Sequence, residues 1–207
     1  MAKRVEGVTE RLLECAKEEF LRNGYENASL RVIAEKAGSS KGAIYIRYPD
    51  KESLYRALTQ PVTDGFCELL KELLSGFESM SPKNQKEQLN SYGNDGFNRL
   101  VDYIYDNFEG FQILLTSGES EIAQEFIHDI VEIDTACTLQ YIEKTKNDAI
   151  SSGRLTAELA HLLSSAFYTG VFEVVIHNME KEDAQRYIQS MNRFYNAGWN
   201  TIFNGIK

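Results

Sequence analysis

The chain has 207 residues, of which 43% are hydrophobic, and a net charge of −9. This composition excludes a disordered chain and is sufficient for a packed core, and with only three prolines long helices are permitted. No apolar run approaches the roughly 20 residues that cross a bilayer, and no apolar segment follows Lys3 and Arg4, so we expect no membrane segment, no secretion signal and a cytoplasmic protein.

The spacing of apolar residues in the N-terminal segment predicts two helices separated by a connector. Apolar residues recur at helical spacing over 8–23, and Gly24 suits the turn that follows a helix. Ser29 is a suitable N-cap for a second helix over 30–37.

A turn and a third helix come next. Residues 38–40 form the turn, and Ser40 can cap a helix over 41–48. Pro49 ends that helix, because the residue before a proline is pushed out of the helical region. Asp50 then opens a fourth helix.

The rest of the chain is also predicted to be helical, with no alternating strand pattern. The fourth helix runs from 51 toward 77, with a kink or restart expected at Pro61. Further helices are predicted at 85–108, weakened by Gly93 and Gly96, at 111–117 after a break at 108–111, at 120–151 after Gly118, at 157–178 with Thr156 as cap, and at 183–204 opened by Asp183.

Charge divides the chain into two parts. Residues 1–60 hold 11 Lys and Arg against 9 Asp and Glu, whereas residues 61–207 hold 11 against 22. Duplex DNA is a dense line of negative charge, so only the first part can face it. The acidity of the second part is explained for the most part by solubility.

The second and third helices have the spacing of a functional unit. Two short helices joined by a glycine-containing turn form a helix-turn-helix, in which the second helix enters the major groove. Taken alone, this spacing is shared by generic helical hairpins.

The residue types in this segment favour a DNA-binding helix-turn-helix over a generic helical hairpin. Residues 11–58 resemble the N-terminal domain of the TetR/AcrR family of bacterial transcriptional regulators. The matching positions, in order, are Phe20, Gly24-Tyr25, Ser29-Leu30, Ile33-Ala34, Ala37-Gly38, Ser40-Lys41-Gly42, Ile44-Tyr45, Arg47-Tyr48 and Lys51-Glu52-Ser53-Leu54. Ser39, Ile46, Tyr48 and Pro49 depart from the residues that are common in the family.

The resemblance implies base contacts from Arg31 and the third helix, phosphate contacts around them, and a buried Ile44 that locks the third helix in place. An arginine that pairs with guanine discriminates by about 1–3 kcal/mol. For Arg47 the alternative is a surface ion pair with Asp50. The residues that we expect to bind DNA are Ser29, Arg31, Ser40, Lys41, Gly42, Ala43, Tyr45, Ile46, Arg47, Tyr48 and Lys51.

The fold class that follows is all-α, with a three-helix helix-turn-helix domain (1–50) and a larger helical ligand-binding and dimerisation domain (51–207) linked by the fourth helix. Residues 157–178 and 183–204 carry wide apolar stripes, part of which we expect in a four-helix interface of a homodimer. The alternative is that these stripes belong to the core of the monomer.

Aromatic residues are plentiful after residue 90, and some are expected to line a pocket for a small molecule. At helical spacing, any one aromatic side chain more often belongs to the core. The residues that we expect to contact the ligand are Phe108, Phe111, Tyr141, Phe167, Tyr168 and Phe172.

These observations predict a transcriptional regulator that binds a double-stranded DNA operator and is released by an unknown small-molecule effector. Metal-ligand spacings and catalytic or nucleotide-binding motifs are missing from the sequence, so we expect no enzymatic activity, no metal and no cofactor. Cys15, Cys67 and Cys137 are expected to be buried thiols. The alternatives are an all-helical enzyme or carrier whose basic hairpin is incidental, and an interaction adaptor.

Overall fold

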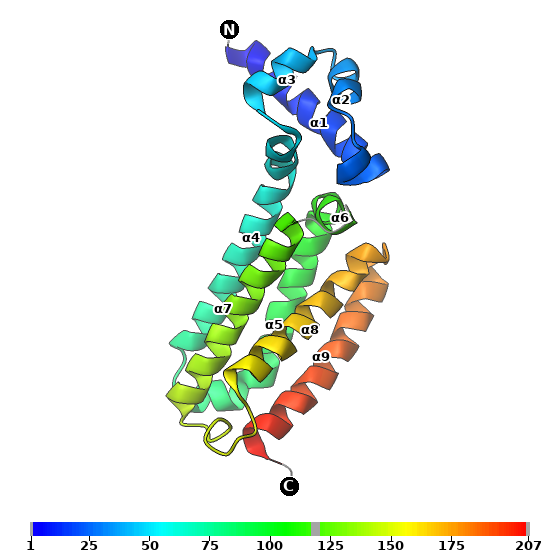
Figure 1. Ribbon diagram of the computed structural model, residues 1–207. Helices are drawn as coiled ribbons and strands as arrows, with labels where there is room; N and C mark the ends of the chain where they lie inside the picture. The colour runs from blue at the N-terminus through cyan, green and yellow to red at the C-terminus, as the bar shows by residue number, and fades with distance from the viewer. Residues whose placement is uncertain (1, 117–120, 206–207) are drawn as a thin grey trace. The chain divides into compact units, whose positions relative to one another are not determined.

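The computed structural model describes residues 2–116 and 121–205, and in these ranges all regular structure is helical (Figure 1). The predicted all-α class is therefore confirmed. The chain forms two compact units. The first unit comprises Met1–Gly65 and Asn107–Ala123, and the second comprises Phe66–Asp106 and Gln124–Lys207.

The first unit contains α1 (Ala2–Asn27), α2 (Leu30–Lys36), α3 (Lys41–Arg47), the beginning of α4 (Lys51–Ser79) and α6 (Phe108–Thr116). The first helix is longer than predicted, and Gly24 interrupts it with φ of 70° and ψ of 174°. Glycine accepts this conformation at little cost because it has no Cβ. The predicted interruption at Gly24 is thus confirmed, while the predicted helix start at Val8 was too late.

The core of the first unit joins α6 to α1 and α4. Phe20 and Tyr55 pack edge to face with ring centroids 5.3 Å apart, and the buried Tyr55 hydroxyl donates to the carbonyls of Ile113 (3.0 Å) and Leu114 (3.3 Å). A Cβ on Gly110 would lie 2.6 Å from Cγ2 of Val62. The break predicted at 108–111 is present but lies at Asn107, between α5 and α6, and Gly110 serves close packing inside α6.

The second unit contains the rest of α4 together with α5 (Pro82–Asp106), α7 (Glu121–Thr145), α8 (Ala157–Ile176) and α9 (Lys181–Asn204), which lie side by side as a bundle (Figure 1). Phe66, Phe126 and Phe172 form a buried aromatic cluster with centroid separations of 5.4–5.6 Å. This cluster joins α4, α7 and α8 by tight apolar packing.

Residues that disfavour a helix lie inside two long helices of the described structure without ending them. The helix α4 continues through Pro61, although that residue has no N–H to donate to the carbonyl of Ala57. Gly93 and Gly96 lie inside α5, where a Cβ on Gly96 would come within 3.6 Å of Leu73. That distance is an ordinary van der Waals contact and nothing lies within 4 Å of a Cβ on Gly93, so packing requires neither glycine, and α5 contains both at the usual cost of glycine inside a helix.

The last helices have slightly different bounds from those predicted. The helix α7 ends at Thr145 rather than 151, and Lys146 follows with a positive φ of 51°. The loop after it is held by the side chains of Asn147 and Arg154, which donate to carbonyls at the end of α9. Thr156 caps α8 as predicted, but α9 begins at Lys181 rather than Asp183. The break predicted at Gly118 lies outside the described residues.

The helix α8 corrects one expectation from composition. Its 20 residues include an 18-residue window with a mean hydropathy of 1.5, so the helix is long and apolar enough to cross a membrane. However, 44% of that window is buried inside the protein, and a single helix of this kind is weak evidence of a membrane span.

The compact units differ from the division predicted at residue 50. They divide α4 between Gly65 and Phe66 and place α6 with the helix-turn-helix, because Tyr55 packs with Phe20 and bonds to α6. Whether DNA binding is confined to residues 1–50 stays a prediction.

Candidate DNA-binding surface and ligand cavity

The helix-turn-helix is built by two serine caps and a glycine turn. The hydroxyl of Ser29 accepts from the amide of Val32 (3.5 Å), and that of Ser40 accepts from the amide of Ala43 (3.1 Å). Gly38 between the helices has a φ of 64°, which favours glycine. Ile44 has no exposed surface, so α3 is fixed by its buried face and its opposite face is presented outward.

A buried carboxylate on α1 holds α2 in place. Glu19 is only 3% exposed, and its Oε1 accepts from the backbone amide of Ser29 at 3.2 Å. The ammonium group of Lys36 lies 3.9 Å from Glu19 and 3.5 Å from Glu18. Sequence reasoning missed Glu19, whose one signal was an acidic residue next to Phe20 on the apolar face of the first helix.

The outward face of α3 combines charge with an apolar side chain. Lys41, Gly42 and Tyr45 are exposed, and the Lys41 ammonium lies 5.5 Å from the centroid of the Tyr45 ring. Ile46 is 86% exposed, an unusual position for a large aliphatic group. In a DNA groove such a group can contact the methyl of thymine.

Two arginines occupy different environments. The Arg31 guanidinium is exposed and pairs with Glu35 at 2.9 Å, a surface ion pair that contributes little and can be exchanged for another partner. The Arg47 side chain is half-buried and donates to the carbonyl of Ala43 at 3.4 Å.

The alternative partner for Arg47 was Asp50, and none of the ion pairs among the described residues joins them. Asp50 instead accepts from the amide and the hydroxyl of Ser53, both at 2.6 Å. These two bonds lower the pKa of its carboxyl and confirm Asp50 as the cap of α4.

Lys51 departs from the expected phosphate contact. Its ammonium donates to the carbonyls of Glu26 (2.8 Å) and Ala28 (3.4 Å) and lies 4.7 Å from the centroid of the Tyr25 ring. The end of a helix leaves carbonyls without intrahelical donors, and the ammonium satisfies two carbonyls there. A phosphate would have to compete with these contacts.

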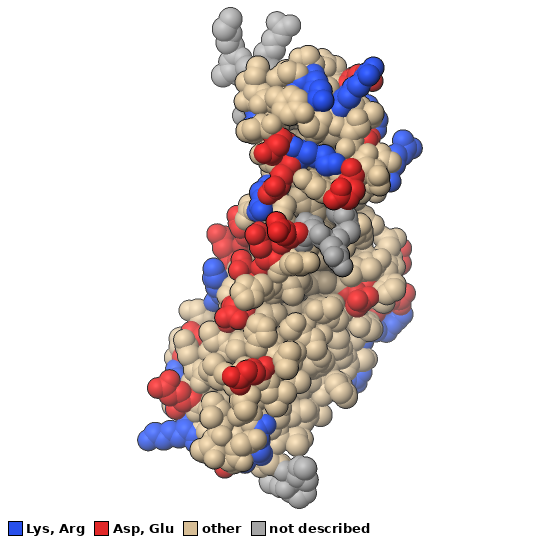
Figure 2. Space-filling view, in the orientation of Figure 1, with Lys and Arg blue, Asp and Glu red and all other residues tan. Residues whose placement is uncertain are grey.

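The structure therefore brings the predicted DNA-binding residues together around one hairpin. Figure 2 shows that both basic and acidic side chains lie on the visible face of the first unit, so its charge is mixed. Arg31, Ser40, Lys41, Gly42, Tyr45 and Ile46 are exposed, whereas Ser29, Ala43, Arg47, Tyr48 and Lys51 are half-buried.

The second unit contains a cavity of about 180 Å³. All five helices of the unit contribute to its wall, which is mostly apolar and aromatic, as is usual for small-molecule sites. The wall is formed by Leu70, Leu73, Leu74, Phe77, Leu89, Tyr92, Gly93, Gly96, Phe97, Leu100, Asp134, Cys137, Thr138, Tyr141, Leu163, Ser164, Phe167, Tyr168, Asn192, Tyr195, Asn196, Trp199 and Phe203.

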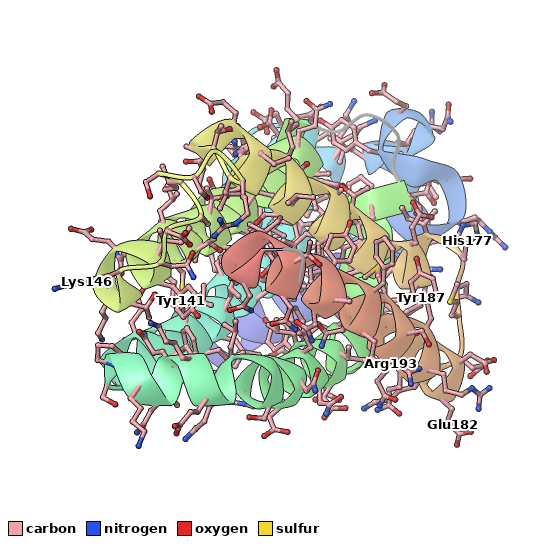
Figure 3. The ribbon with its side chains drawn as sticks, turned by 90° about the horizontal axis from the view of Figure 1, so that it is seen from below. Tyr141, Lys146, His177, Glu182, Tyr187 and Arg193 are labelled. Atoms are coloured by element: carbon pink, nitrogen blue, oxygen red, sulfur yellow. The ribbon has the colours of Figure 1, made fainter. Side chains whose placement is uncertain are left out.

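Three of the six predicted ligand residues, Tyr141, Phe167 and Tyr168, line this cavity. Tyr141 lies within the bundle, while Lys146 and His177 lie at its periphery (Figure 3). Phe108, Phe111 and Phe172 do not belong to the wall. The first two lie in α6 of the first unit, and Phe172 packs in the core with Phe66 and Phe126.

Asp134 is the polar feature of the wall that sequence reasoning missed. Its carboxyl accepts from the hydroxyls of Ser164 (2.5 Å) and Tyr168 (3.4 Å), and burial raises its pKa. A signal was present, because Asp134 shares one face of α7 with the buried residues Ile130, Cys137 and Tyr141. A charged residue on a buried helix face is a candidate for function.

The cysteine of the cavity wall, Cys137, is an unreactive thiol. Burial raises the pKa of the Cys137 thiol to about 12, so it stays protonated and is a poor nucleophile. Cys15 is also buried, whereas Cys67 is half-buried. Among the described residues, no group of three or more His, Cys, Asp and Glu side chains is arranged to hold a metal ion.

An apolar face of α8 and α9 remains uncovered. Leu162 is 64% exposed and Phe194 is 76% exposed, and Leu159, Ile176 and Tyr187 are also exposed. On α8 these residues follow helical spacing on one side, whereas the opposite side, with Phe167 and Val171, is buried.

Comparison with known proteins identifies the helix-turn-helix. Residues 12–58 match the family model of bacterial regulatory proteins, tetR family. Through this segment, the chain is similar to bacterial regulatory proteins of the tetR family. The match covers most of α1, α2, α3 and the beginning of α4, the segment on which the resemblance rested.

The curated relatives of this N-terminal segment are transcriptional repressors. The HTH-type transcriptional repressors AcnR of Corynebacterium glutamicum and Corynebacterium diphtheriae are 38% identical over 61 residues, which is 30% of this chain. The chain thus spans about a third of the length of the curated relatives that it matches, 32% of each.

Solved structures extend the likeness to the whole fold. NalD, the secondary repressor of the MexAB-OprM multidrug efflux pump in Pseudomonas aeruginosa, superposes with a TM-score of 0.57 at 19% identity over 93% of this chain and 97% of that one. The transcriptional regulator FadR from Bacillus subtilis, in complex with stearoyl-CoA, has a TM-score of 0.55 at 17% identity over 96% and 100%. At such identities the likeness concerns the fold alone.

Proposed function

We propose that this protein is a transcriptional repressor of the TetR family that binds an operator as a homodimer and leaves it when a small molecule enters the cavity. The observation that carries the proposal is α3, a capped helix whose buried Ile44 fixes an outward face of Lys41, Gly42, Tyr45 and Ile46. Such a face is suited to enter the major groove, where base edges are read.

The uncovered apolar face of α8 and α9 supports the homodimer. An exposed apolar surface of this kind marks an interface, and two helices from each subunit can form a four-helix interface. A two-fold dimer reads two half-sites, which we expect to be spaced by about 34–36 Å or a multiple of it.

The cavity and α4 support control by a ligand. Leu70, Leu73 and Phe77 of α4 line the cavity, while Leu54 and Tyr55 of the same helix are buried in the first unit. A ligand that favours one position of α4 would shift the population of dimers whose recognition helices fit the operator.

The test begins with the purified full chain and a pool of random-sequence duplex DNA at a fixed salt concentration. Retained fragments are sequenced, and we expect a motif with two-fold symmetry. Recovery of no motif, with binding that disappears as salt rises, would reduce the interaction to nonspecific phosphate contacts and overturn the proposal.

A further inference from the structure

Asp134 is an acidic group without a counterion in an apolar cavity. None of the described residues that line the cavity is Lys, Arg or His, and Asp134 belongs to none of the ion pairs described in the structure. Its partners are two neutral hydroxyls, those of Ser164 and Tyr168. An ionised carboxylate removed from water is costly unless a positive charge accompanies it.

The neutral donors still orient this carboxyl. Ser164 donates to Oδ2 and Tyr168 to Oδ1, and both residues are buried in α8. A carboxylate oxygen has more than one acceptor site, so each oxygen keeps capacity for a further positive group. Because Asp134 is part of the wall, that group can arrive from the cavity.

The aromatic wall suits the same kind of ligand. Phe167 is in contact with Phe97 (4.8 Å) and Tyr195 (4.9 Å), and Tyr141 with Phe77 (6.0 Å) and Phe203 (5.1 Å), between ring centroids. Aromatic faces attract cations, including quaternary ammonium groups, and also accept apolar bodies.

We propose that the cavity binds lipophilic cations, amines or quaternary ammonium compounds with an aromatic or aliphatic body, and that the Asp134 carboxylate is their counterion. The proposal rests on the proposed function, since it names the class of effector for the same cavity. Free carboxylic acids are disfavoured, because the described wall offers no positive charge to pair with them.

The proposal implies that binding is linked to a proton. Burial raises the pKa of Asp134, and a cation binds the ionised form, so cation affinity falls as the pH drops below this raised pKa. The other titratable groups of the wall are Cys137 and Tyr141 on α7, Tyr92 on α5, Tyr168 on α8 and Tyr195 on α9, with Glu78 of α4 close to Cys137. Thiols and phenols ordinarily titrate above neutral pH. Among the described wall residues, Asp134 is therefore the group whose charge changes at acidic pH.

The wall contains a built-in reporter. The sequence has one tryptophan, and Trp199 lines the cavity. Its fluorescence is titrated with benzyltrimethylammonium, with the uncharged isostere neopentylbenzene and with the anion 3-phenylpropionate. We expect saturable binding of the cation, binding of the isostere that is weaker by about tenfold or more, and no saturation with the anion.

Variants of α7 assign the effect to one carboxyl. Asp134→Asn keeps the shape of the side chain and is expected to weaken the cation by about tenfold or more while leaving neopentylbenzene unchanged. Asp129→Asn, at an exposed position of the same helix, is the matched control and should bind all probes as the unmodified chain does. Equal cation affinity in Asp134→Asn and the unmodified chain would overturn the proposal.

Two further readouts keep the outcomes separate. If Asp134→Asn fails to fold, the pH profile of the unmodified chain decides, because cation affinity must fall with decreasing pH while affinity for the isostere stays level. A flat profile for the cation overturns the inference. Release of the selected operator is measured independently, so cation binding without release would contradict the proposed function and leave the assignment of the ligand class standing.

Discussion

The carboxylate of Glu19 accepts a hydrogen bond of 3.2 Å from the backbone amide of Ser29, the residue that caps α2. This contact joins α1 to the start of the helix-turn-helix, and its acceptor Glu19 is buried. The position of α2 therefore depends on an acidic side chain in the core of the first unit.

Replacement of Glu19 by Ala should destabilise the protein by about 1–3 kcal/mol, because the part-buried amide of Ser29 loses its acceptor. Urea unfolding followed by circular dichroism measures this change. Glu18→Ala is the control, since Glu18 also approaches Lys36 but is exposed and should change stability by less than about 0.5 kcal/mol. Equal effects of the two variants would refute the structural role of Glu19.

Arg47→Ala should weaken binding to the selected operator by about 1–3 kcal/mol and binding to random duplex much less, if this arginine reads a base. Fluorescence anisotropy with both duplexes at one salt concentration provides the comparison. Lys86→Ala, an exposed change on α5, should leave both affinities unaltered. An equal loss on both duplexes would reduce Arg47 to a phosphate contact.

Gly110→Ala should destabilise the first unit by about 1–3 kcal/mol, because its Cβ would lie 2.6 Å from Val62. The second change Val62→Ala should recover part of this loss, a coupling that a double-mutant cycle measures. Gly93→Ala is the matched control: it is helical with nothing within 4 Å of the added carbon, so a gain of up to about 1 kcal/mol is expected. Additive effects at 110 and 62 would argue against the clash.

Phe194→Asp should shift the protein from dimer to monomer and abolish high-affinity operator binding, because it places a charge in the proposed interface of α8 and α9. Sedimentation velocity measures the mass of each variant. Ile150→Asp, also at an exposed isoleucine but in the loop after α7, should remain dimeric. A dimeric Phe194→Asp protein would place the interface elsewhere.

The stability of the ligand-free protein should depend on Asp134. Its folded-state pKa is raised by burial, so its contribution is fully present below the unfolded-state pKa and is lost as the pH rises through the folded-state value. Asp134→Asn cannot ionise, so it avoids the loss of stability that ionisation of the buried carboxyl causes. We expect its melting temperature to exceed that of the unmodified chain at neutral pH, and the difference to be smaller at acidic pH. A difference that does not change with pH would contradict the assigned pKa direction.

Local signals predicted the helix-turn-helix well. The caps at Ser29, Ser40 and Asp50 depend on residues three positions apart, and all three are confirmed. The same local rules placed the break between α5 and α6 around Gly110 rather than at Asn107, and α4 continues through Pro61 without a restart. Tertiary packing decides whether a helix continues through a proline or a glycine. The intramolecular contacts of Lys51 were not predicted for a similar reason, since its carbonyl partners lie more than 20 positions earlier in the chain. Its phosphate contact stays a prediction.

The ligand cavity was the harder prediction. Tyr141, Phe167 and Phe172 are indistinguishable by residue type and helical spacing, yet the first two face the cavity and the third faces the core. Only the packing of helices distant in sequence separates them. Asp134 was the more informative residue, because a carboxyl on a buried face is costly and requires a reason.

The return of the chain to the first unit at α6 has a consequence for how this protein can be made and divided. Tyr55 hydrogen-bonds to the carbonyls of Ile113 and Leu114, so the core of the first unit is closed by a segment synthesised more than 50 residues later. A fragment that stops at Gly65 would lose the acceptors of a buried hydroxyl and the packing of Gly110 against Val62. The helix-turn-helix unit is therefore not a detachable module, and during synthesis it has to wait for most of α4 and all of α5 before its core is complete.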